Sequence, residues 1–182
     1  MVTARPQAAA WYRRAQRAAD PHRAAAVMLH FAYGSNMSRV VMRRHAPDAE
    51  PVGAARLPGY RFVISANGYA SVAPAHGGTV HGVLWRLTPR DRVTLDVWES
   101  VAAGEYDVAM LPVVHAGHRR RALVYVARRR RAGAAKPGYM EVVIAAGREW
   151  QLPEAYIASL LRFVPKRPLG AGQRKFGEFG WT

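Results

Sequence analysis

The stretch Met28-Leu-His-Phe-Ala-Tyr33-Gly34-Ser35-Asn36-Met37 joins a short apolar run to a Gly-Ser-Asn turn. The apolar run predicts a strand over residues 28–33, and Ser38 can cap a helix over about residues 39–45. A glycine behind a strand allows a positive φ or a close approach of the backbone to a ligand, and successive N–H groups there can bind an anion. On these residues alone, a plain capped turn is the commoner interpretation.

Strands dominate the chain beyond this stretch, and Asn67-Gly68 is a hairpin signal between two of them. The further predicted strands cover residues 61–65, 70–74, 79–87, 106–114 and 121–127. Turns are predicted at residues 57–60 and at Gly77-Gly78.

Helices are predicted between and after these strands rather than in regular alternation with them. They cover residues 89–98, 139–146 and 153–163, with Thr88 as the cap of the first and Gly147 as the end of the second. The fold class is therefore α+β, with a mixed or antiparallel sheet that can close into a small β-barrel with flanking helices.

The bulk properties suit one compact domain of 182 residues, half of them hydrophobic. We place this domain at residues 28–164, after a basic Ala/Arg-rich extension at residues 1–27, helical or disordered, and before an irregular tail at residues 165–182. Whether Met1 or Met28 starts the protein stays open. Cysteine is absent, which excludes disulfides, thiol catalysis and thiolate metal sites and is compatible with the expected cytoplasmic location.

The net charge is +15, and all but three of the 27 basic residues are arginines. They are dispersed over several segments that share no obvious helix face, so a nucleic-acid partner is not expected. A positive field would instead raise the local concentration of anionic small molecules. No run of about 18 apolar residues predicts a membrane span, and a homodimer stays open.

Glu99 is a candidate acid/base because it follows an apolar helix and adjoins Trp98. Lost solvation would raise its pKa toward neutrality, which suits proton transfer near pH 7. The alternative is a solvated carboxylate at a helix end. Tyr106 and Tyr139 can donate hydrogen bonds from apolar segments or serve as ordinary core residues. The chain lacks the common metal, nucleophile-elbow and dinucleotide motifs, so neither a metal nor a cofactor is expected.

Four segments in this order resemble the γ-glutamylcyclotransferase family, a relative of the AIG2-like proteins. They are Phe31 to Met37, Val80 to Leu87, Leu95 to Val101 followed by Gly104-Glu105-Tyr106, and Tyr139 followed by residues 147–149 and 152–156. Together they cover about residues 28–164. One departure is Ser100, where the family often has glycine after its catalytic glutamate.

The resemblance implies a small β-barrel with flanking helices and an enzyme that cyclises a γ-glutamyl group to 5-oxoproline, releasing an amino acid or amine. Glu99 would be the catalytic acid/base. The substrate-binding residues would be Tyr33, Gly34, Ser35, Asn36, Tyr106 and Tyr139. The alternatives are a γ-glutamylamine or a γ-glutamyl-protected biosynthetic intermediate as substrate, or a non-catalytic basic protein that binds RNA or an acidic partner.

Overall fold

A computed structural model describes residues 28–128 and 131–165. The predicted N-terminal extension, and the predicted tail from residue 166 onward, lie outside the described residues. The strands are β1 (Met28–Ala32), β2 (Glu50–Ile64), β3 (Ala70–Leu87), β4 (Tyr106–His115) and β5 (His118–Ala127).

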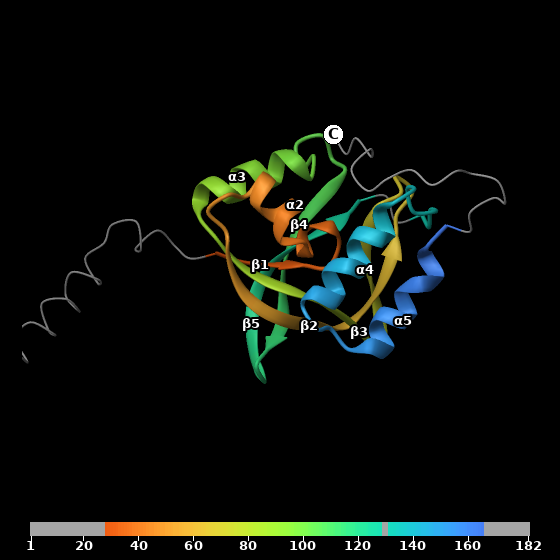
Figure 1. The fold of residues 1–182 in the computed structure, drawn as a ribbon. Helices are drawn as coiled ribbons and strands as arrows, with labels where there is room; N and C mark the ends of the chain where they lie inside the picture. Colours follow the sequence, from red (N-terminus) through yellow and green to blue (C-terminus); the bar gives the residue numbers. More distant parts are fainter. Residues whose placement is uncertain (1–27, 129–130, 166–182) are drawn as a thin grey trace, which may run out of the picture.

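The five strands form a closed barrel in the order β1-β3-β2-β4-β5 (Figure 1). Neighbouring strands pair antiparallel, except that β1 closes the barrel against β5 in parallel, with His30 opposite Leu123. The predicted fold class, a small mixed barrel with flanking helices, is confirmed.

The β2–β3 hairpin is longer than the sequence pattern predicts. Ile64 pairs with Ala70 across the predicted Asn67-Gly68 turn. However, the turns predicted at residues 57–60 and at Gly77-Gly78 are wrong, because both lie inside continuous strands. Pro58 pairs with Thr79 and Tyr60 with Pro74, so residues 75–78 bulge opposite Gly59. Gly59 and Gly77 take left-handed φ values of 79° and 68°, which the bulge requires.

The helices are α2 (Arg39–His45), α3 (Pro89–Trp98), α4 (Tyr139–Glu149) and α5 (Glu154–Leu160), with short 3-10 turns η1 (Ser35–Met37) and η2 (Leu161–Phe163). Figure 1 shows α2 and α3 together over one end of the barrel and α4 and α5 along its side. Buried apolar side chains from all five strands and from α2 to α5 form one core.

Local capping explains where α2 and α3 begin. The predicted Ser38 cap of α2 is present, since its hydroxyl accepts from the Val41 N–H at 3.4 Å. Thr88 and Asp91 form a capping box at α3, with distances of 3.1 and 3.0 Å. The fully buried Asp91 also accepts from the Asp48 N–H at 3.1 Å, which ties the chain before β2 to α3.

The helix predicted over residues 139–146 does not end at Gly147. That prediction is wrong, because α4 continues to Glu149. A Cβ atom at Gly147 would lie 2.5 Å from Ile157 Cδ1 of α5. The glycine therefore serves close packing of the two helices rather than helix termination. Pro153 precedes α5 as predicted.

Candidate active site

A cavity of about 560 Å³ opens at the end of the barrel that α2 and α3 cover. Its walls come from the turn after β1, from α2, from the end of α3, from the β2–β3 hairpin and from the start of α4. The structure brings every site residue predicted from the sequence to this cavity: Tyr33, Gly34, Ser35, Asn36, Glu99, Tyr106 and Tyr139.

Gly34 is required for close packing rather than for a positive φ. Its φ is −111°, which any residue can adopt. A Cβ atom there would lie 2.6 Å from the Tyr139 hydroxyl and 3.2 Å from the Ala70 Cβ. The turn behind it is closed by the Met37 N–H, which donates to the Gly34 carbonyl at 3.0 Å. Within the described residues, the N–H groups of Ser35 and Asn36 donate to no main-chain carbonyl, and the Ser35 N–H faces the Tyr139 hydroxyl.

Glu99 ends α3 as its C-cap, and its N–H donates to the Leu95 carbonyl at 2.8 Å. The half-buried carboxyl group accepts from Asn36 Nδ2 at 2.7 Å. Burial raises the pKa of Glu99 to about 7; the Asn36 hydrogen bond lowers it and the charge of Asp96 raises it. The structure thus gives Glu99 the environment that suits a proton acceptor and donor at neutral pH.

Ser100 preserves the turn behind Glu99 although the related family often has glycine there. Its φ is 51°, in the left-handed region that glycine enters most easily. Its N–H donates to the Val97 carbonyl at 3.0 Å, and its carbonyl accepts from the Glu105 N–H at 3.2 Å. The departure from glycine therefore leaves the main-chain path after α3 closed by hydrogen bonds.

Three tyrosine hydroxyls bond main-chain groups in the wall of the cavity. Tyr106 donates to the Ala70 carbonyl at 3.0 Å, Tyr139 accepts from the Ala70 N–H at 3.2 Å, and Tyr33 donates to the Tyr125 carbonyl. Burial raises the pKa of Tyr139 to about 12 and raises the pKa values of Tyr33 and Tyr106 as well. All three hydroxyls therefore keep their protons at neutral pH and can donate hydrogen bonds.

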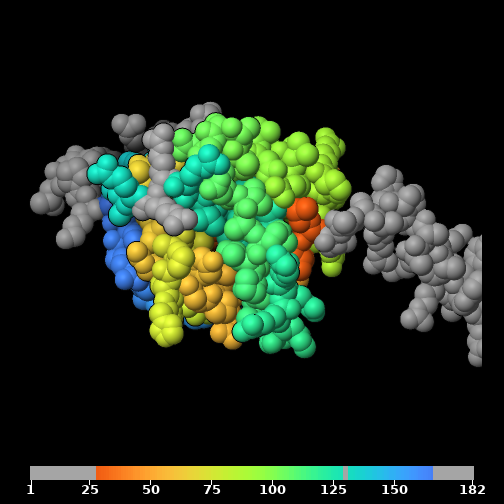
Figure 2. All heavy atoms as spheres, turned by 180° about the vertical axis from the view of Figure 1, so that it is seen from behind, coloured from red at the N-terminus to blue at the C-terminus, as the bar shows by residue number. Residues whose placement is uncertain are grey.

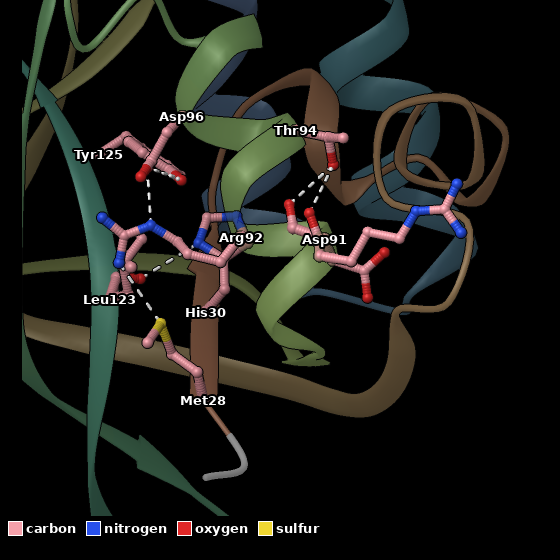
Figure 3. A network of polar contacts seen from close by, with 9 residues as sticks. Met28, His30, Asp91, Arg92, Thr94, Asp96, Leu123 and Tyr125 are labelled. Atoms are coloured by element: carbon pink, nitrogen blue, oxygen red, sulfur yellow. Dashed lines mark hydrogen bonds and ion pairs between the residues drawn. The ribbon is translucent and has the colours of Figure 1, made fainter. Parts of the chain in front are cut away.

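A polar network fastens α3 to the barrel one turn before Glu99 (Figure 3). Asp96 Oδ1 accepts from Arg92 Nε and from the Tyr125 hydroxyl, each at 2.7 Å. Arg92 also contacts Met28 Sδ at 3.4 Å. The Tyr125 side chain lines the cavity. The network thus links β5 to the end of α3, and the charge of Asp96 acts on Glu99.

Sequence reasoning missed Asp96 and Tyr125 as site residues. Asp96 lies in the segment that resembles the related family, so a signal was present, but Tyr125 is one of several apolar residues in a strand pattern. They are 29 residues apart, on a helix and a strand, and only the barrel brings them together.

Two stacked pairs at the cavity rim were also missed. His45 stacks on Trp98 with ring centroids 3.6 Å apart, and Lys136 Nζ lies 4.5 Å from the centroid of the Tyr69 ring. Lys136 is further fixed by its N–H, which donates to the Gly68 carbonyl at 3.1 Å. The rim thus combines aromatic faces with positive charge.

No group of three or more metal-binding side chains occurs in the described part of the chain. Among the helices of residues 28–128 and 131–165, none is long and apolar enough to cross a membrane.

Known proteins resemble this chain in sequence and in fold. The model of the AIG2-like family matches residues 79–160. A protein of Mus musculus named γ-glutamylcyclotransferase is 26% identical over 153 residues, which are 78% of this chain and 81% of that protein. The chain thus resembles the AIG2-like and γ-glutamylcyclotransferase proteins in sequence. The family match includes α3, Glu99 and Tyr139.

Several solved structures share this fold. One titled γ-glutamyl cyclotransferase superposes with a TM-score of 0.73 at 23% identity, covering 81% of this chain and 94% of that one. An uncharacterised protein from Homo sapiens gives a TM-score of 0.73 at 24% identity with the same coverage. YkqA from Bacillus subtilis gives a TM-score of 0.65 at 24% identity, covering 84% of this chain and 57% of that one.

Proposed function

We propose that this protein cyclises a γ-glutamyl group to 5-oxoproline and releases the amine that the group carried. The observation that carries the proposal is the Glu99 carboxyl group, which lines the cavity with a pKa of about 7 and a hydrogen bond from Asn36. Similarity to a Mus musculus protein named γ-glutamylcyclotransferase supports it.

The reaction requires one group that accepts a proton and then returns it. The α-ammonium group of the substrate cannot attack while it is protonated, so the Glu99 carboxylate takes one proton from it. The freed amine attacks the γ-carbonyl carbon of the same glutamyl group and closes the five-membered ring. Protonated Glu99 then donates to the leaving nitrogen, and the C–N bond breaks. The second proton of the ring nitrogen passes to the released amine, which leaves as an ammonium ion, and the ring becomes the neutral lactam. Proton transfer of this kind typically contributes about 10²–10⁴-fold to the rate.

Because the attack is intramolecular, the remaining residues chiefly hold the bent substrate. The N–H groups of Ser35 and Asn36 bind negative oxygen, either the α-carboxylate or the oxyanion of the tetrahedral intermediate. Tyr106 and Tyr139 both bond the main chain of Ala70, which lies beside Gly34, and shape the wall that receives the glutamyl group. Each of these roles uses a group that the chain itself supplies.

The test is release of 5-oxoproline from γ-glutamyl dipeptides, γ-glutamylamines, a γ-glutamyl-protected amine and glutathione. Glu99→Gln should retain the fold and lose at least about 100-fold in turnover. Glu141→Gln, an exposed carboxyl group on α4, is the matched control and should retain turnover. Near-full activity of Glu99→Gln would refute the assigned mechanism, and the best substrate identifies the leaving group.

A further inference from the structure

The end of the barrel away from the cavity carries arginines that strand pairing brings together. Val114 of β4 pairs with Arg56 of β2 on one side and with Arg119 of β5 on the other. Directly opposed residues in a sheet share a face, and residues two apart on a strand do so too, so Arg121 joins the same face. All three arginines are exposed. We call Arg56, Arg119 and Arg121 the arginine face.

The chain segments that carry the arginine face contain no acidic residues near these arginines in sequence. Residues 51–90 and residues 108–140 contain no Asp or Glu. Within the described residues, the ion pairs join Arg39, Arg86, Arg92 and Arg128 to acids located elsewhere. None of these pairs involves the arginine face, whose charge is therefore not neutralised by a described carboxylate.

The arginine face stands on a well-held hairpin far from the cavity. His115 Nδ1 lies 2.9 Å from the Ala54 carbonyl oxygen and fastens the end of β4 to β2. From Tyr106 at the cavity to His115, the ten residues of β4 span roughly 30 Å at the usual rise of a strand. The hairpin extends away from α3 in Figure 1 and forms one part of the lower edge of the molecule in Figure 2, on the right.

We propose that the arginine face binds the phosphate backbone of a nucleic acid. Main-chain spacings put Arg119 and Arg121 roughly 7 Å apart, and Arg56 and Arg119 roughly 10 Å apart, which suits a chain of regularly spaced anions. Guanidinium groups bind phosphate oxygens through two parallel hydrogen bonds. The β4 neighbours on this face, Pro112 and Val114, are aliphatic, and the ring of His81, opposite Arg56 on β3, is half-buried against Tyr156. Binding is therefore independent of base sequence.

A nucleic acid fits this surface better than a lipid bilayer does. The hairpin turns at Ala116-Gly117, which has no aromatic or long apolar side chain to enter a bilayer. The sequence pattern predicts no nucleic-acid partner, because the arginines are dispersed along the chain. Pairing of β2, β4 and β5 reverses that argument by placing three of them on one face.

The test compares two variants of the full chain with equal loss of charge. The first is Arg119→Gln with Arg121→Gln; the matched control is Arg43→Gln with Arg90→Gln, two exposed arginines of α2 and α3 that lie outside the cavity lining. Fluorescence anisotropy measures binding to labelled single-stranded RNA and DNA of about 20 nucleotides over a range of NaCl concentrations. Melting temperatures confirm that both variants fold.

The first variant should bind at least about tenfold more weakly than the control, and its plot of log K against log salt should be less steep by about 1.4, or 0.7 for each lost phosphate contact. Equal binding of RNA and DNA identifies the shared phosphate backbone as the ligand, and stronger RNA binding adds the 2′-hydroxyl. Equal loss in both variants, or no binding at low salt, would overturn the proposal. Binding to phosphatidylserine vesicles but not to either oligonucleotide would overturn it in favour of a membrane.

Discussion

At the scale of single residues, two neighbours shift the pKa of the Glu99 carboxyl group in opposite directions. Asn36 donates to it and stabilises the carboxylate, whereas the charge of Asp96 one turn earlier disfavours it. Burial exceeds both effects and raises its pKa to about 7. Changing a neighbour should therefore move the pH at which the carboxyl group titrates without touching the group itself.

The first prediction concerns Asp96→Asn. The amide oxygen can still accept from Tyr125, but the negative charge beside Glu99 is lost, so the pKa of Glu99 should fall. If Glu99 acts as the base, the acidic limb of the kcat/KM profile should move to lower pH. Asp107→Asn, which removes only an exposed partner of Arg128, is the control and should leave the limb in place. An unmoved limb in Asp96→Asn would contradict the assigned coupling.

The second prediction concerns Gly34→Ala. The added methyl group would meet the Tyr139 hydroxyl at 2.6 Å, so the variant should lose about 1–3 kcal/mol in free energy of unfolding. In a Tyr139→Phe background that hydroxyl is absent, and the same substitution should destabilise less, with the Ala70 Cβ contact at 3.2 Å remaining. Urea unfolding of the four proteins measures the coupling. Strictly additive effects would mean that the turn relaxes away from Tyr139.

At the scale of elements, α4 and α5 pack closely because a glycine inside α4 allows it. Helix propensity alone predicts that Gly147→Ala stabilises the protein by about 1 kcal/mol. The Ile157 Cδ1 atom would lie 2.5 Å from the new methyl carbon, so we expect a net loss of about 1–2 kcal/mol instead.

Ile157→Val removes the Cδ1 atom that the methyl group would meet, so it tests this third prediction. Gly147→Ala should be neutral or stabilising in that background, and thermal or urea unfolding of the double-mutant cycle gives the coupling free energy. If Gly147→Ala changes the free energy of unfolding in the same direction in both backgrounds, α4 and α5 move apart enough to accommodate the methyl group.

At the scale of the whole molecule, two buried titratable groups oppose each other as pH changes. His30 lies where β1 closes on β5, and burial lowers its pKa to about 4 from 6.5. Between these two pH values the unfolded chain binds a proton at His30 and the folded protein does not. The stability that neutral His30 allows is therefore lost as pH falls from about 6.5 to about 4. Glu99 has the raised pKa, so its effect is the reverse, and stability is lost as pH rises from about 4.5 to about 7.

The fourth prediction is that these effects offset each other between about pH 4.5 and 6.5 in the wild type. Glu99→Gln removes one of them, so the free energy of unfolding relative to wild type should rise with pH by about 1 kcal/mol per unit in this window. Urea unfolding at several pH values measures it. A profile of Glu99→Gln that runs parallel to the wild type would mean that Glu99 is ionised in the folded state throughout this window.

Much of the fold follows from local signals in the chain. The caps at Ser38 and Thr88, the Asn67-Gly68 hairpin and the start of the last helix after Pro153 are all confirmed, because each depends on residues close together in the sequence. The predictions of turns at residues 57–60 and at Gly77-Gly78 are wrong, because residues close together in the sequence do not decide the structure there. Glycine and proline are equally typical of a turn and of a bulge, and only the opposite strand distinguishes them.

The sequence by itself determined the residue types of the candidate site: a carboxyl group after an apolar helix, a Gly-Ser-Asn turn after a strand, and tyrosines in apolar segments. Tertiary structure alone decided that Asn36 meets Glu99 across 63 residues and that Asp96 meets Tyr125. It also decided that Gly147 packs rather than ends a helix, and that Arg56 shares a face with Arg119. The physical reason is that burial, hydrogen bonding and steric contact depend on distance in space, whereas sequence patterns report only neighbours along the chain.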